Sequence, residues 1–176
     1  MLPDGFQTAR LIARPIAAGD RDAIFESYAQ DAEVTRYLTW RPHRGRDDTA
    51  SYIAHCLEIP PTVARTYVLT DRDDGAIRGA IDLRLAAAHR IEVGYVLGRR
   101  WWGQGLMTEI LAAVADWALR QDDVFRISAV CDVENIASAR VLEKAGLVRE
   151  GLLRRYLLHP GVSDAPRDCF SYARVR

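Results

Sequence analysis

The feature that most constrains the fold is a glycine-containing junction between a strand and a helix near the middle of the chain. Residues 90–97 are rich in β-branched and aromatic side chains and predict a strand. Apolar side chains then recur at helical spacing from residue 104 to about 120, which predicts an amphipathic helix. Between them, residues 100–105 include two glycines, which allow a close backbone approach. The unpaired amides of a helix start favour an anion there, such as a pyrophosphate.

Two well-known phosphate-binding loops do not fit this junction. A dinucleotide-binding loop needs a third glycine, and Thr108 stands where that glycine belongs. A P-loop needs a lysine directly after its last glycine, and the one lysine of the chain is the distant Lys144. Taken alone, the junction therefore fits a tight turn without a ligand as well as it fits a pyrophosphate site.

A second strand–helix unit follows and supplies a resemblance. Residues 125–131 predict a strand, Asn135 and Ser138 predict a helix start, and Gly146 predicts its end. With the junction, this unit resembles the GNAT superfamily of acetyl-CoA-dependent N-acetyltransferases. The opening at residues 10–15, and a tail with residues 150–154, Asp168 and Tyr172, resemble its branch of ribosomal-protein N-terminal alanine and serine acetyltransferases. The resemblance covers nearly the whole chain.

The composition favours one enzyme domain. The 176 residues contain no linker, repeat or low-complexity tract, so residues 1–176 are expected to form a single N-acetyltransferase domain. Basic and acidic residues number 24 each, which predicts neither a nucleic-acid nor a membrane partner. The three cysteines lack metal-binding spacing, so no metal is expected. No signal peptide or membrane-spanning stretch is visible, which predicts a cytoplasmic protein.

The order of the predicted elements favours an α/β (α+β) fold, with a mixed, twisted sheet of about seven strands flanked by helices. The predicted strands span residues 8–16, 66–70, 77–85, 90–98, 125–131, 147–158 and 169–175. The predicted helices span residues 20–30, 34–38, 47–57, 104–120 and 136–145. The resemblance implies that the sheet is splayed beside the strand that carries Val96.

The resemblance also implies acetyl-CoA as co-substrate and most of its contacts. In the family, the pantetheine arm pairs with the free backbone of the splayed strand, and the glycine loop holds the pyrophosphate. Asn135 would bond the pantetheine near the thioester, although it also fits a plain helix cap. The two tryptophans of the loop fit packing, and stacking on adenine stays open. The expected cofactor residues are Tyr95, Val96, Leu97, Arg100, Trp101, Trp102, Gly103, Gln104, Gly105, Leu106 and Asn135.

Acetyl transfer to an amine requires that the ammonium lose a proton and that the leaving thiolate be stabilised. By resemblance, Glu92 is the expected base, directly or through a water, with an exposed or ion-paired strand glutamate as the alternative. A backbone N–H of Val96 or Leu97 is expected to polarise the thioester. Many members place a tyrosine acid where this chain has Leu142, so Ser138 is the expected acid, unless it only caps or packs.

The sequence leaves the acceptor open. By resemblance, substrate walls come from the segment after the first helix and from the last hairpin, which points to Trp40, His43 and Asp168. A turn at residues 159–161 predicts an exposed His159. A protein N-terminus and a small amine both remain, although the arginines at positions 36, 41, 44 and 46 argue mildly against a polycation. A catalytically silent acetyl-CoA sensor is the third alternative. Homodimers are common in the branch, and no residue decides the oligomeric state.

Overall fold

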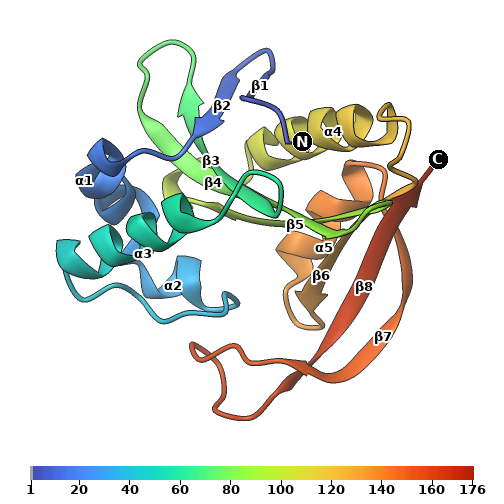
Figure 1. The fold of residues 1–176 in the computed structure, drawn as a ribbon. Helices are drawn as coiled ribbons and strands as arrows, with labels where there is room; N and C mark the ends of the chain where they lie inside the picture. Colours follow the sequence, from blue (N-terminus) through green and yellow to red (C-terminus); the bar gives the residue numbers. More distant parts are fainter. Residues whose placement is uncertain (1) are drawn as a thin grey trace.

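Residues 2–176, described by a computed structural model, fold around one open eight-stranded sheet (Figure 1). The strands are β1 (Phe6–Gln7), β2 (Leu11–Pro15), β3 (Ala64–Asp71), β4 (Ile77–Ala87), β5 (Arg90–Leu97), β6 (Arg126–Asp132), β7 (Val148–Leu157) and β8 (Arg167–Val175). Their order is β1-β2-β3-β4-β5-β6-β8-β7. Only β5 and β6 pair in parallel. The mixed sheet is confirmed, with eight strands rather than about seven, because the two-residue β1 is too short to leave a pattern.

Helices cover both faces of the sheet (Figure 1). The helices α1 (Arg21–Ile24), α2 (Ala32–Thr35) and α3 (Arg46–Glu58) lie on one face, and α4 (Leu106–Leu119) and α5 (Ile136–Lys144) lie on the other. Between α1 and α2 the chain makes a wider helical turn at Phe25–Ala29, so the helix predicted for residues 20–30 consists of two pieces. We call these two sides the α1–α3 face and the α4–α5 face.

Each face carries its own apolar core. On the α4–α5 face, fully buried Ile110 and Val114 of α4 pack in one cluster with Ile91 of β5. On the α1–α3 face, a smaller cluster joins Ile24 and Ile53 of the helices to residues of β3 and β4. Because side chains alternate along a strand, neighbouring residues of β5 belong to different faces.

The strands β5 and β6 pair only at their first residues. The register joins residues 90–92 of β5 to residues 126–128 of β6. Beyond that point β5 stays paired with β4 as far as Leu97, and β6 stays paired with β8 as far as Asp132. The expected splay beside the strand of Val96 is therefore confirmed. It opens toward the ends from which α4 and α5 follow.

Candidate active site

Backbone groups of β5 point alternately toward β4 and into the splay. The N–H of Gly98 donates to the carbonyl of Arg78 on the β4 side, over 2.8 Å. The carbonyl of Val96 also points to β4, since a Cβ added to Gly79 would lie 2.2 Å from it. Successive residues of a strand direct their backbone groups to opposite neighbours. The amide of Val96 therefore faces β4, and it is not available to polarise a thioester in the splay.

Tyr95 and Leu97 carry the backbone groups that face the splay. Their N–H and C=O groups have opposite directions to those of Val96. The carbonyl of Leu97 accepts a hydrogen bond of 2.7 Å from Nε1 of Trp102. Of the three residues expected to pair with pantetheine, Tyr95 thus offers its N–H and C=O groups to a ligand in the splay, and Leu97 offers its N–H.

The glycine loop ends in a helix start without a side-chain cap. Gly103 and Gly105 both have φ near +75°, the left-handed region that glycine adopts without strain. This backbone delays α4, which begins at Leu106 rather than at the predicted Gln104. Gly105 is the N-cap residue and has no side chain to bond the first-turn amides. Those amides are therefore free to bind an anion.

Arg10 holds this loop from another part of the chain. Its Nη1 donates to the carbonyl of Gln104 over 2.9 Å, and its Nε lies 2.7 Å from the carboxylate of Glu109 on α4. The backbone N–H of Arg10 also donates to Glu109. The sequence pattern around the loop carries no sign of Arg10, because 94 residues separate it from Gln104.

The loop's larger side chains have distinct surroundings. The guanidinium of Arg78 lies 3.5 Å from the ring centroid of Trp101, so Trp101 packs beside the loop. Trp102 is 47% exposed and keeps its ring available at the surface. Arg99 pairs with Asp31 at 3.0 Å. Within residues 2–176, the exposed guanidinium of Arg100 has no ion-pair partner, as a residue that binds phosphate requires.

A groove of about 530 Å³ lies on the α1 side of the loop. Arg14, Asp20, Arg78, Arg100 and Trp101 are among the residues that line it. Its charges are largely paired, with Arg14 on Asp20 at 2.6 Å and Arg78 on Asp74 at 2.5 Å. Neither of the expected reacting side chains, Glu92 and Ser138, lines it.

The start of α5 lies across the splay from β5. Asn135 caps the helix, because its Oδ1 accepts a 3.1 Å hydrogen bond from the N–H of Ser138. The hydroxyl of Ser138 is 2.8 Å from the phenol oxygen of Tyr95. Burial raises the pKa of Tyr95 above its usual value, against the effect of the bond to Ser138. Leu142, at the position where the resemblance implies a tyrosine in many members, is fully buried. The predicted role of Tyr95 was mostly a main-chain one, and the contact of its phenol with Ser138 was not predicted.

Glu92 lies on the face of β5 opposite to the side chain of Tyr95, beside the point where the splay begins. It is the last residue of β5 in register with β6, and it is opposite Arg84 of β4. Its carboxylate is partly buried and has no hydrogen bond or ion pair to any of residues 2–176. A base that must meet an incoming ammonium needs such a free carboxylate.

A second carboxylate, Asp82, lies on the same face and was not predicted. It is opposite Gly94 in the β4–β5 register, and it accepts a 3.1 Å hydrogen bond from Thr66. Arg84 lies 3.2 Å from it. Burial raises the pKa of Asp82, against the charge of Arg84 and the bond from Thr66. The sequence carries a signal for this position of Asp82. Along residues 77–85, Asp82 and Arg84 alternate with apolar residues, so they interrupt the apolar pattern on one face of the strand only.

Trp40 and His43 form an aromatic cluster on the α1–α3 face. Their rings are 4.8 Å apart, and Trp40 is 6.2 Å from the ring of Tyr52. Nδ1 of His43 is 2.8 Å from the hydroxyl of buried Thr49. Burial lowers the pKa of His43, with Asp48 acting in the opposite direction. Trp40 and Val96 pack against the same apolar core, so this cluster lies on the face of the sheet that carries the side chain of Val96.

The loop between β7 and β8 lies below α2 in the view of Figure 1 and packs on the segment that follows α2. His159 is only 3% exposed, so its predicted exposure is wrong. The turn at residues 159–161 packs on the segment after α2, where Nδ1 of His159 is 3.4 Å from the carbonyl of Leu38. Arg41 and Asp164 pair across the same contact at 3.0 Å. Long-range packing overrides the local turn signal.

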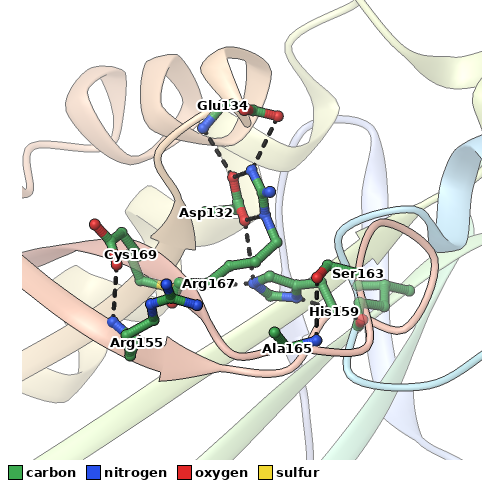
Figure 2. Close-up of polar contacts among 10 residues, drawn as sticks. Asp132, Glu134, Arg155, His159, Ser163, Ala165, Arg167 and Cys169 are labelled. Atoms are coloured by element: carbon green, nitrogen blue, oxygen red, sulfur yellow. Dashed lines mark hydrogen bonds and ion pairs between the residues drawn. The ribbon is translucent and has the colours of Figure 1, made fainter.

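Figure 2 shows how Asp132, at the end of β6, joins this loop to the start of α5. Arg167 of β8 binds both carboxylate oxygens of Asp132, at 2.5 and 3.1 Å, and also pairs with Glu134. The N–H of Glu134 donates to Asp132 over 2.9 Å, and Nε2 of His159 lies 3.8 Å from the carboxylate of Asp132. Burial alone would raise the pKa of Asp132, but these bonds and charges lower it.

Asp168, expected at the acceptor wall, is bound within the last hairpin. Its Oδ1 accepts a 2.8 Å hydrogen bond from the N–H of Arg155. Arg155 has φ 51° in a bulge of β7. Trp40 and His43 contact each other, whereas no hydrogen bond or ion pair within residues 2–176 joins Asp168 to either of them.

Within residues 2–176, no group of three or more histidine, cysteine, aspartate or glutamate side chains is placed to hold a metal ion. In the same residues, no helix combines the length and apolar character needed to cross a bilayer.

Comparisons with known proteins agree with this arrangement. The family model described as "Acetyltransferase (GNAT) domain" matches residues 10–148. The uncharacterized N-acetyltransferase YoaA of Bacillus subtilis is 32% identical over 97% of this chain and 96% of its own. The alanine N-acetyltransferase of ribosomal protein uS5 from Escherichia coli is 27% identical over 88% of this chain and 83% of its own.

Among solved structures, the fold matches that of MccE, a microcin C7 self-immunity acetyltransferase in complex with acetyl-CoA and AMP. The TM-score is 0.87 at 19% identity, covering 99% of this chain and 98% of that one. At this identity the match establishes the fold.

Proposed function

Since the chain belongs to the GNAT acetyltransferase family, as an N-acetyltransferase, we propose that it transfers an acetyl group directly from acetyl-CoA to a primary amine. The observation that carries this proposal is the splay between β5 and β6, which ends beside the uncapped start of α4. A pantetheine arm fits an unpaired strand edge, and a pyrophosphate fits a helix start.

We assign the cofactor contacts from the arrangement of the free groups. The backbone of Tyr95 and Leu97 would pair with the pantetheine amides. The first-turn amides of α4 and the unpaired guanidinium of Arg100 would bind the pyrophosphate. Arg10 would keep the loop in place through Gln104 and Glu109, without contacting the ligand itself. Acetyl-CoA supplies an acetyl group activated as a thioester.

Glu92 would accept the proton of the acceptor's ammonium group, directly or through a water. The neutral amine then attacks the acetyl carbonyl, whose oxygen the amide of Tyr95 or Leu97 would stabilise. The C–N bond forms, the nitrogen releases its second proton to water, and the C–S bond breaks with its electron pair going to sulfur. Ser138 would stabilise the thiolate. Glu92 lies on one face of β5, and Ser138 of α5 contacts Tyr95 on the other face. This arrangement suits two groups that act on opposite sides of one thioester.

For the acceptor, we propose a protein N-terminal amine. The relative that acetylates the alanine of ribosomal protein uS5 supports this choice. The likeness to MccE supports the alternative, a small-molecule amine. The arginines weighed above discriminate less than the sequence suggested, because Arg41 pairs with Asp164 and Arg46 pairs with Asp22 and Glu26. We further propose a cytoplasmic enzyme, and a homodimer as in many relatives of the branch.

The test is acetyl-CoA-dependent release of CoA with two acceptor pools. One pool contains short peptides with free alanine, serine or threonine N-termini, and the other contains small amines and amino acids. Turnover with peptides alone supports the proposed acceptor, and turnover with small amines alone supports the alternative. Tight binding of acetyl-CoA without turnover in either pool would contradict the enzyme and favour a sensor.

A further inference from the structure

Two hydroxyl groups meet across the opening of the splay. The phenol oxygen of Tyr95, on β5, is 2.8 Å from the hydroxyl oxygen of Ser138, in the first turn of α5. It is also 3.3 Å from the backbone carbonyl of Ser138. The ring of Tyr95 packs against the core of the α4–α5 face, and the N-cap Asn135 holds the N–H of Ser138. Both partners are therefore fixed by the fold.

The geometry gives this pair two hydrogen-bonding arrangements. Tyr95 has one hydroxyl proton and can donate it either to the carbonyl of Ser138 or to its hydroxyl oxygen. In the first arrangement, Ser138 donates its own proton to Tyr95. In the second, Ser138 accepts from Tyr95, and its proton is free to bond a third group. The second arrangement makes Ser138 a better donor, because hydrogen bonds in a chain polarise one another.

We propose that Tyr95 is a positioning residue that holds Ser138 as a hydrogen-bond donor to the thiolate of CoA. This inference rests on the proposed function, because it needs CoA in the splay with its sulfur beside Ser138. At the position of α5 where many GNAT members carry a tyrosine, this chain has the buried Leu142, which has no hydroxyl. Tyr95 of β5 therefore supplies a phenol that α5 lacks.

The pair acts as a donor and not as an acid. A thiol has a pKa near ~8.5 and a phenol near ~10, so a thiolate does not take the proton of a phenol. Burial strengthens this order, since it raises the pKa of Tyr95 further. When the C–S bond breaks, the electron pair goes to sulfur and the charge is stabilised by the bond from Ser138. The ammonium proton goes to Glu92 and then to solvent before the attack. The second proton leaves the nitrogen for water after the C–N bond has formed, and water returns one proton to the departing thiolate.

The test measures the thiol pKa of bound CoA from the ultraviolet absorbance of the thiolate. Complexes with desulfo-CoA serve as the reference, which removes the absorbance of ionising tyrosines. Substitutions Tyr95→Phe and Ser138→Ala should each raise the thiol pKa by about one unit, a tenfold change in the ionisation constant. The affinity for CoA at neutral pH should change little, because the thiol is then mostly neutral.

Tyr172→Phe is the matched control. Its phenol also bonds α5, through Glu143 at 3.3 Å, but does not touch Ser138. This variant should leave the thiol pKa as in the wild type. If CoA binds and Tyr95→Phe has the wild-type thiol pKa, the inference is overturned while the proposed function stands. If the wild type does not bind CoA, the proposed function fails and the inference fails with it.

Discussion

At the scale of the residue, the groups assigned to the reaction differ in how firmly the protein holds them. Ser138 has two partners, Asn135 through its N–H and Tyr95 through its hydroxyl. Glu92 has none among residues 2–176. This difference suits their roles, because a donor to a fixed thioester gains from a fixed geometry, whereas a base must meet a substrate that arrives from solvent.

Glu92→Gln should lower turnover most at neutral and low pH, by about 100-fold if Glu92 is the only base. The defect should shrink as the pH rises past the pKa of the acceptor's N-terminal amine, about 8, because the acceptor then loses its proton without help. The measurement is the pH profile of the rate at saturating acetyl-CoA. Glu58→Gln, at the exposed end of α3, is the control. A profile for Glu92→Gln that matches the wild type at every pH would remove Glu92 from the mechanism.

Gly103→Ala tests the backbone of the glycine loop. A Cβ on Gly103 meets nothing within 4 Å, so the cost arises from its φ of +75° alone. We expect a loss of about 1–2 kcal/mol in the free energy of unfolding. Acetyl-CoA should also bind more weakly, because the loop amides would turn away from the pyrophosphate.

Gly151→Ala is the matched control for this change. Gly151 likewise has open space around its Cβ position, but lies in β7 without a positive φ. Stability and acetyl-CoA affinity should be unchanged in this variant, as measured by denaturant unfolding and by titration calorimetry. Equal acetyl-CoA affinity for both glycine variants would contradict the pyrophosphate assignment.

At the scale of the element, Asp132 connects the end of β6 with the turn that follows it and with two segments much further along the chain. It is the last residue of β6, and it bonds β8 through Arg167 and the β6–α5 turn through Glu134. His159 brings the β7–β8 loop to the same carboxylate (Figure 2). The turn before α5, which leads to Asn135 and Ser138, is thereby connected to the β7–β8 loop.

Asp132→Asn should destabilise the protein by about 3 kcal/mol at pH 7, because it leaves Arg167 without its buried partner. The folded-state pKa of Asp132 is lowered, so its contribution is present above the unfolded-state pKa and lost as the pH falls through the folded-state value. The difference between wild type and variant should therefore shrink below pH ~4. Denaturant unfolding at several pH values measures it.

Asp164→Asn removes a comparable ion pair at the surface and serves as the control. The side chain of Asp164 is 94% exposed in its pair with Arg41, so the expected change is under about 1 kcal/mol. A loss for Asp132→Asn that stays constant down to pH 3 would show that the effect does not come from the charge of this carboxylate.

At the scale of the whole molecule, the sequence predicted the cofactor half better than the acceptor half. The glycine loop and the start of α5 follow from local patterns within residues 90–146, the splay follows from the family resemblance, and the structure has all three. The acceptor side depends on contacts between distant segments, such as His159 with Leu38, which no local pattern records. Arg10 and the phenol of Tyr95 were missed for the same reason, since their partners lie 94 and 43 residues away.

The central claim, that acetyl-CoA pairs with the free edge of β5, is tested most directly by amide hydrogen exchange with and without acetyl-CoA. Tyr95 and Leu97 direct their amides into the splay, whereas Val96 faces β4. Acetyl-CoA should slow exchange at Tyr95 and Leu97 and leave the already bonded amide of Val96 unchanged. Exchange at Tyr95 and Leu97 that stays the same at saturating acetyl-CoA would contradict the account.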